Sequence, residues 1–324
     1  MEFIRKTPLY IDIGNDARRQ YIDTQSVFSA WEDALREAAE VRGGMYWKRQ
    51  GKGEYLIRTS VKNTQKSLGA RSRETQAIYA KFTLRKSEAE ARVSELQAQL
   101  VRQQRMNRAL HVGRAPPLLV DILAEVARSG VGEHFTVVGT HALYAYESAA
   151  CVRIESPEAL ATRDIDLLWD TRKRLRFMTR MKVLGASMLA LLKKVDPTFK
   201  LRRDQRYTAV NSKGFEVDIL RPLAAEDDRP LRMTEDESDF WAVYAKRAEV
   251  LLNAPAFSSL VISPSGHMAR MRTVAPAAFI EFKRWMAQQA DRDPLKAPRD
   301  ALQADLVEEL VAEYLPQQAR QAPR

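Results

Sequence analysis

The sequence predicts an α+β fold in which a small mixed sheet is flanked by helices. Three short segments, 135–138, 162–170 and 215–220, alternate apolar and polar residues or are rich in β-branched and aromatic side chains. Stretches with helical spacing separate them and follow them. We expect a basic, mostly helical N-terminal region over 1–120, a core over 121–230, a C-terminal helical subdomain over 231–316 and a disordered tail over 317–324.

The composition indicates an ordinary globular protein. Of the 324 residues, 45% are hydrophobic and 29% are charged, which argues against intrinsic disorder. Cys151 is the single cysteine, so an intramolecular disulfide and a cysteine-based metal site are both excluded. This usage predicts a reducing, cytoplasmic location. No apolar run approaches the roughly 18 residues of a membrane span, so we expect no membrane association.

Positive charge is concentrated at the start of the chain. The net charge is +10, and residues 1–120 hold 22 Lys and Arg against 13 Asp and Glu. This asymmetry suggests contact with an anionic macromolecule such as RNA or tRNA. The alternative is a solvated, charged helix surface.

The N-terminal region is expected to contain two helices and a hairpin. An amphipathic helix covers 24–42, and a hairpin over 43–60 carries Tyr46, Trp47 and Tyr55. Those aromatic side chains would stack on nucleic acid or would pack a small domain. A basic loop is expected over 66–75, followed by a long charged helix over 75–109. The narrow apolar stripe of that helix favours a long helix that is either exposed or paired, with a homodimer as one arrangement.

The remainder is expected to alternate helices with short strands. A proline pair opens a helix near residue 117, and a glycine turn opens another over 141–149. Residues 151–162 are interpreted as a loop. Further helices are expected over 171–195, around Trp241 and Tyr244, over 276–289 and over 300–315. Hairpins are expected over 207–220 and 258–274.

Two aspartates on one predicted strand carry the chemistry. Side chains alternate along a strand, so Asp164 and Asp166 share one face while Ile165 and Leu167 share the other. Neighbouring carboxylates repel each other unless a cation lies between them, and such hard oxygen ligands suit Mg²⁺. The upstream Gly139-Thr140 turn, which opens a helix, is a candidate phosphate cradle. Asp218 lies in a similar apolar strand.

This arrangement resembles the polymerase-β-like nucleotidyltransferase superfamily and its minimal fold. The resemblance implies that Gly139 and Thr140 hold the triphosphate and that Asp164, Asp166 and Asp218 bind two Mg²⁺. Thr140 departs from the Ser or Gly usual at that place, yet keeps a hydroxyl and a backbone N–H. Without this chemistry, Asp164 would cap a strand end and Asp218 would pair with an arginine.

Two further resemblances extend beyond the core. The segments KSLGARSRET, VGRAPPLLVDIL and DRDPLKAPRDALQADLV are similar to a bacterial family of nucleotidyltransferase-fold proteins of unassigned activity. The C-terminal pattern is also similar to abortive-infection-type toxin nucleotidyltransferases. That second resemblance implies that basic residues contact the triphosphate, at the positions Lys283, Arg292 and Lys296, followed by Asp300. The alternative for these cations is salt bridges with Asp291, Asp293 and Asp300.

The sequence therefore predicts a Mg²⁺-dependent enzyme that transfers a nucleoside monophosphate from an NTP to an acceptor hydroxyl. RNA or tRNA is the expected acceptor, and a toxin-like or defence role follows from resemblance alone. A catalytically silent nucleotide- or RNA-binding protein and an enzyme that nucleotidylates a protein are the alternatives. His141 follows the phosphate turn, where it would approach a ligand or serve the packing of the helix.

Overall fold

The computed structural model describes residues 9–61, 63–223, 229–319. The chain divides into two compact units, one made of residues up to 18 together with 107 onward, the other of residues 19–106. The division into functional regions at residues 120, 230 and 316 stays a prediction. The prediction of a disordered tail over 317–324 was wrong for 317–319, which belong to the short helix α11 (Pro316–Ala319), and residues 320–324 lie outside the described residues.

A mixed sheet lies at the centre of the larger unit, as predicted. Its strand order is β11-β12-β10-β7-β5, with β9 paired to β10 and β8 paired to β9. The central pair, β7 (Asp164–Trp169) and β10 (Glu216–Arg221), runs parallel. The strand β5 (Phe135–Val138) pairs antiparallel with β7, and β9 (Thr208–Val210) pairs antiparallel with β10. The remaining strands are β8 (Lys200–Leu201), β11 (Leu231–Arg232) and β12 (Trp241–Tyr244).

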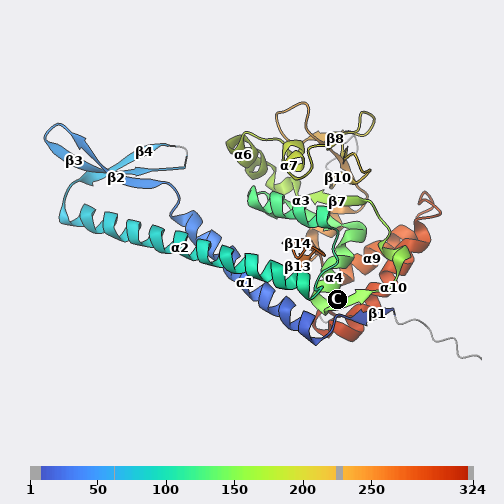
Figure 1. The fold of residues 1–324 in the computed structure, drawn as a ribbon. Coiled ribbons are helices and arrows are strands. Elements are labelled where there is room, and N and C mark those ends of the chain that lie inside the picture. Colours follow the sequence, from blue (N-terminus) through green and yellow to red (C-terminus); the bar gives the residue numbers. More distant parts are fainter. Residues whose placement is uncertain (1–8, 62, 224–228, 320–324) are drawn as a thin grey trace, which may run out of the picture. The chain divides into compact units, whose positions relative to one another are not determined.

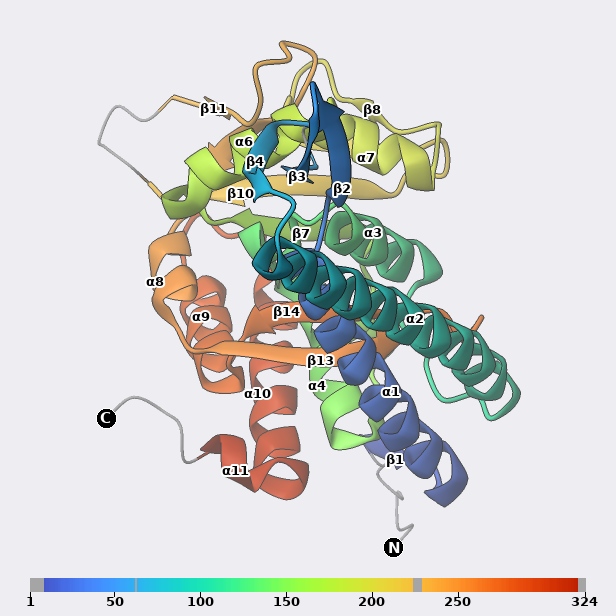
Figure 2. The ribbon, with the colours of Figure 1, turned by 90° about the vertical axis from the view of Figure 1, so that its left-hand side faces the viewer.

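Helices and a separate two-stranded hairpin surround this sheet (Figures 1 and 2). The hairpin is β13 (Ala256–Ile262) with β14 (Met268–Val274), and the C-terminal helices are α9 (Pro276–Ala287) and α10 (Ala297–Tyr314). Thr273 donates a 2.7 Å hydrogen bond to the carbonyl of Val137, which ties the hairpin to β5. The other helices are α3 (Pro117–Arg128), α4 (Leu143–Ala150), α6 (Arg174–Leu184), α7 (Met188–Val195) and α8 (Ala248–Asn253).

Two predictions in this unit were wrong. Trp241 and Tyr244 lie on the strand β12 rather than on a helix, because this apolar, aromatic segment pairs with β10. Residues 151–162 are not a plain loop, since they contain β6 (Val152–Ile154) and the single turn α5 (Pro157–Leu160). The partner of β6 is β1 (Tyr10–Asp12), a strand that the sequence analysis missed.

The smaller unit consists mainly of two long helices and a three-stranded sheet. Helix α1 (Asn15–Glu40) and helix α2 (Arg73–Ala109) both cross its boundary, and α1 begins earlier than predicted. The predicted hairpin is present as β2 (Gly44–Gln50) and β3 (Gly53–Thr59). The predicted basic loop was wrong in part, because Gln65–Ala70 forms a third strand, β4, on the edge of β3.

Helix α2 is hydrogen-bonded to α1 within the chain, and only part of its apolar stripe is buried. Leu100 is buried, and Gln103 accepts a 2.6 Å hydrogen bond from Gln20 of α1. Pairing with a second copy of the chain stays a prediction. Among the described residues, no helix combines the length and the apolar character needed to cross a membrane.

Candidate active site

Three aspartates meet where the two parallel central strands lie side by side. In the β7–β10 register, Asp166 lies opposite Asp218, and Asp164 lies opposite Glu216. Carboxylate oxygens of Asp164, Asp166 and Asp218 lie within 4.8 Å of one another. The apolar residues that alternate with them are fully buried on the other face of the sheet: Ile165, Leu167, Val217 and Ile219. The alternation that the sequence predicts therefore places all three carboxylates on one face.

Burial and mutual repulsion disfavour full ionisation of this cluster. Burial, followed by the charges of Asp164 and Asp218, raises the pKa of Asp166 to about 7. Burial raises the pKa of Asp218 to about 6, although a 2.5 Å hydrogen bond from Thr208 opposes the shift. The hydroxyl of Thr162 donates a hydrogen bond to the carboxylate of Asp164. Three partly buried carboxylates that repel one another are the donor set a hard divalent cation requires, so these residues fit Mg²⁺.

These raised pKa values predict how stability depends on pH. A carboxyl group that is harder to ionise in the folded protein stabilises the fold while it is protonated. That contribution is lost as the pH rises from about 4 through about 7. We expect the metal-free protein to lose about 2 kcal/mol more between pH 5 and pH 8 than its Asp166→Asn variant. Thermal melts of both proteins in chelator at the two pH values test this, and parallel curves would contradict it.

Gly139 lies directly against one of these carboxylates. It follows β5, whose last residue, Val138, is paired with Asp166. Its φ of +70° is in the left-handed region, and a Cβ atom there would collide with Oδ2 of Asp166. Only glycine meets both conditions. The turn continues as a 3₁₀ turn, Gly139–Ala142, into α4, so the predicted helix start is offset by two residues.

The Gly139→Ala variant is expected to disturb this carboxylate. The new methyl group would displace Asp166, and the strained backbone would cost about 1 kcal/mol of stability. We expect the transfer activity that the sequence resemblance implies to fall by about 100-fold, since displacements of about 1 Å cost that much in enzymes. Initial rates and urea unfolding measure the two effects. Gly185→Ala is the matched control, because its φ is +59° and a Cβ atom added there would meet no atom within 4 Å. Equal losses of activity in both variants would contradict this assignment.

A glutamine that the sequence analysis missed is hydrogen-bonded to the Gly139-Thr140 turn. The side chain of Gln303, on α10, is fully buried and donates to Oγ1 of Thr140 at 3.1 Å and to the carbonyl of Ala159 at 2.6 Å. The Thr140 hydroxyl therefore accepts one hydrogen bond and keeps its proton to donate. The available signal was a pair of polar residues, Asp300 and Gln303, three positions apart on a face that continues with buried Ala304 and Val307.

Two of the three predicted basic residues, Lys283 and Arg292, bind one buried carboxylate. Asp300 is fully buried and accepts from Nζ of Lys283 at 2.7 Å and from Nε of Arg292 at 2.7 Å. The salt-bridge alternative therefore holds for Asp300, although this pair is buried rather than on the surface. Burial lowers the pKa of Lys283, while Asp300 and Asp166 oppose the shift. Lys296 is exposed at the start of α10 and, with Lys283, favours the charged form of Asp166.

His141 packs among aromatic rings. Its ring centroid lies 6.0 Å from that of Tyr144 and 6.1 Å from that of Phe215. Burial lowers its pKa to about 4, so the imidazole is neutral at physiological pH. This environment favours the packing interpretation of His141.

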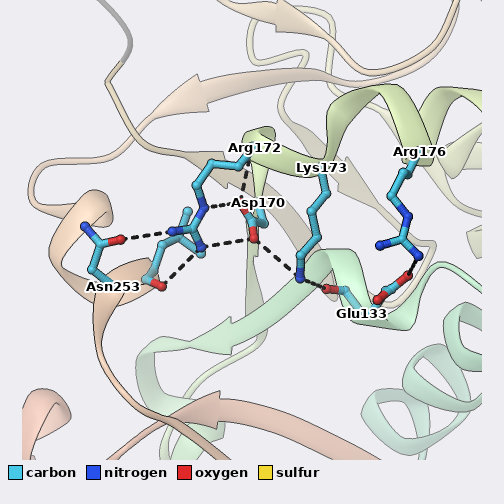
Figure 3. A network of polar contacts seen from close by, with 7 residues as sticks. Glu133, Asp170, Arg172, Lys173, Arg176 and Asn253 are labelled. Atoms are coloured by element: carbon cyan, nitrogen blue, oxygen red, sulfur yellow. Dashed lines mark hydrogen bonds and ion pairs between the residues drawn. The ribbon is translucent and has the colours of Figure 1, made fainter.

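The other acidic group on this segment, Asp170, is engaged elsewhere. It directly follows β7 and accepts from Nε of Arg172 at 2.7 Å, while Arg172 also donates to Asn253 at 2.9 Å (Figure 3). Lys173 lies 3.6 Å from Asp170, and burial is outweighed by these cations, which hold the pKa of Asp170 below its ordinary value. This network fixes the end of β7 and explains why Asp170 is absent from the aspartate cluster.

Comparison with known proteins identifies the family. A protein-family model described as Nucleotidyltransferase matches residues 118–324, which is more than half of the chain and includes every candidate site residue named above. No curated protein matches the chain, and no solved structure matches it. The mixed sheet, the glycine turn and the strand aspartates are consistent with the family match. The chain therefore belongs to the nucleotidyltransferase family.

Proposed function

We propose that this protein is a Mg²⁺-dependent nucleotidyltransferase that transfers a nucleoside monophosphate from an NTP to an acceptor hydroxyl. The observation that carries the proposal is the cluster of Asp164, Asp166 and Asp218 on two adjacent strands, with ligand atoms within 4.8 Å of one another. The membership of the family supports the reaction class. A bound cation would explain why three partly buried carboxylates lie together, because without a cation their mutual repulsion would destabilise the fold.

In this proposal the three carboxylates divide the work. Asp164 and Asp166 would hold two Mg²⁺, with Asp218 as a ligand to one of them. Bound Mg²⁺ would offset charge on the triphosphate and lower the pKa of the acceptor hydroxyl. Asp218 would accept the proton of that hydroxyl as the acceptor oxygen bonds to the α-phosphorus. The bond between the α-phosphorus and the pyrophosphate oxygen breaks in the same displacement.

The neighbouring residues would position the triphosphate. Gly139 brings the backbone close to Asp166, and Thr140 has a hydroxyl proton to donate to a phosphate oxygen. Lys283 and Lys296 already act electrostatically on Asp166, so they are the cations best placed to offset phosphate charge. Arg292 is bound to Asp300 and would serve mainly to hold that carboxylate.

RNA, including tRNA, is the acceptor that the charge distribution favours, and a protein hydroxyl is the alternative. A toxin-like or defence role is supported only by the C-terminal resemblance to abortive-infection-type enzymes. A silent binding protein would have no physical need for the three clustered carboxylates.

The test supplies each labelled NTP with Mg²⁺, total RNA and cell lysate. We expect label from one or more NTPs to enter an RNA band, and the Asp164→Ala/Asp166→Ala variant to give none. Label in a protein band would replace RNA by a protein acceptor. Label that is unchanged in the double variant would contradict the assignment of the site. Absence of transfer, together with NTP-dependent thermal stabilisation, would favour the silent binder.

A further inference from the structure

The net positive charge of the protein is confined to one short segment. Residues 44–86, which span β2, β3, β4 and the start of α2, contain 11 Lys and Arg against two Asp and Glu. The resulting +9 compares with +10 for the whole chain, so the remaining residues are nearly neutral together. Such a local excess is the electrostatic footprint of a polyanion-binding surface.

Most of this charge is neither buried nor neutralised. Six of its cations are exposed and form no ion pair with a described residue: Lys48, Arg49, Lys52, Lys66, Arg73 and Lys81. The neighbouring Arg71 does pair with Glu54, one of the two acidic residues in the segment. A solvated structural surface normally interleaves both signs, whereas this one presents uncompensated cations.

Helix α2 packs against one face of the sheet of this segment. Trp47 lies 5.9 Å from Tyr79 of α2, and Arg58 lies 4.3 Å over Phe82 of α2, so these side chains face the helix. Figure 1 shows α2 along this face of the three strands and, among the described residues of this unit, no helix on the other face. We call the other face the open face.

The open face combines aromatic, basic and small polar side chains. By strand alternation, Tyr46, Lys48 and Tyr55 point away from α2, and so does Ile57, which is buried between its neighbours. Lys48 lies directly opposite Tyr55, and Tyr46 lies diagonal to it, with an exposed fraction of 38%. The exposed polar residues on this face include Gln65 and Ser67. Tyrosine rings with a lysine between them suit stacked bases and their phosphates, and amide and hydroxyl groups suit a ribose 2′-hydroxyl.

We propose that the open face of β2, β3 and β4, together with the exposed lysines and arginines of residues 44–86, binds single-stranded RNA. A duplex hides its base faces within the stack, so a flat aromatic surface favours an unpaired strand. The further step, that this strand is the acceptor of the transferred nucleotide, rests on the proposed function. The binding itself requires neither NTP nor Mg²⁺.

The test measures binding of the full chain to a labelled 12-nucleotide RNA by fluorescence anisotropy, in chelator and without NTP, over a range of salt concentrations. The Lys48→Gln/Lys52→Gln/Lys66→Gln variant should flatten the slope of log affinity against log salt by about 2. The control is Arg92→Gln/Arg102→Gln/Arg105→Gln, which removes the same charge from exposed sites on α2 beyond the segment and should leave the slope unchanged.

The aromatic contribution is separated by a second pair of variants. Tyr46→Ala/Tyr55→Ala should weaken binding by at least about tenfold without changing the salt slope, whereas Tyr46→Phe/Tyr55→Phe keeps the rings and should retain most of the affinity. Circular dichroism checks that each variant is folded. If the alanine and phenylalanine variants weakened RNA binding equally, the stacking contact would be overturned, and with it the proposal.

Competing anions give the remaining outcomes. Preference for duplex RNA, for DNA of the same sequence, for an oligoglutamate peptide or for phosphatidylserine vesicles would each overturn the proposal, as would no binding. RNA binding with the expected variant effects, but without nucleotide transfer, would contradict the proposed function and leave this inference intact. Transfer of nucleotide to RNA with no contribution from residues 44–86 would support the proposed function and contradict this inference.

Discussion

The Asp166→Asn variant is expected to transfer nucleotide at least about 1,000-fold more slowly than the wild-type protein. The substitution keeps the shape of the side chain but removes a charged ligand from the cluster, and the electrostatic contribution of such a group is commonly worth this much. At pH 8 without metal, the same variant should melt at a higher temperature, because it removes the carboxylate whose pKa is raised by burial and, to a smaller extent, by the charges of Asp164 and Asp218. Initial rates and thermal melts measure both effects.

A neighbouring acidic residue provides the control. Glu216 lies opposite Asp164 in the same strand pair but is bound to Arg202 at 2.8 Å, outside the aspartate cluster. Glu216→Gln should keep its rate within about threefold of the wild type. If Asp166→Asn and Glu216→Gln lost activity equally, the total negative charge of this strand pair, rather than the arrangement of the three aspartates, would explain the activity. If Asp166→Asn were less stable and fully active, the carboxylate would have only a structural role.

The Asp300→Asn variant is expected to lose about 3 kcal/mol of unfolding free energy. Removing one partner of a buried ion pair leaves an uncompensated charge, and both Lys283 and Arg292 depend on this carboxylate. Urea unfolding measures the loss. Asp291→Asn is the control, since it breaks an exposed ion pair with Lys246 and should cause no measurable change.

A double variant separates stability from function at this position. Lys283→Met/Asp300→Asn removes both charges, so much of the lost stability should return while transfer remains impaired. In Asp300→Asn alone, the KM for NTP should rise because Lys283 is no longer held near Asp166. Recovery of both stability and activity in the double variant would show that Lys283 does not act on the substrate.

The sequence was most informative where a period of two coincided with a buried strand. The apolar residues Ile165, Leu167, Val217 and Ile219 determine which face of each strand is buried, so the aspartates between them had to share the other face. The sequence could not indicate that β7 and β10 are adjacent and in register, since pairing depends on the whole topology. The close approach of Gly139 to Asp166 likewise appears only in three dimensions.

The errors have specific physical causes. The segment KSLGARSRET looked like a basic loop because its small residues and glycine carry little strand propensity, yet pairing with β3 overrides that preference. Trp241 and Tyr244 were placed on a helix although aromatic residues fit strands well, and their pairing with β10 decides the outcome. Gln303 was missed because a single buried glutamine has no sequence signature without its partners, Thr140 and Ala159.

The central claim is that Asp164, Asp166 and Asp218 together form one divalent-cation site for a nucleoside triphosphate. Isothermal titration calorimetry with Mg²⁺, in the presence of a non-hydrolysable NTP analogue, tests it most directly. We predict saturable binding of two ions per chain in the wild-type protein and loss of that binding in the variant with all three aspartates changed to asparagine. Equal binding by the two proteins would contradict the claim.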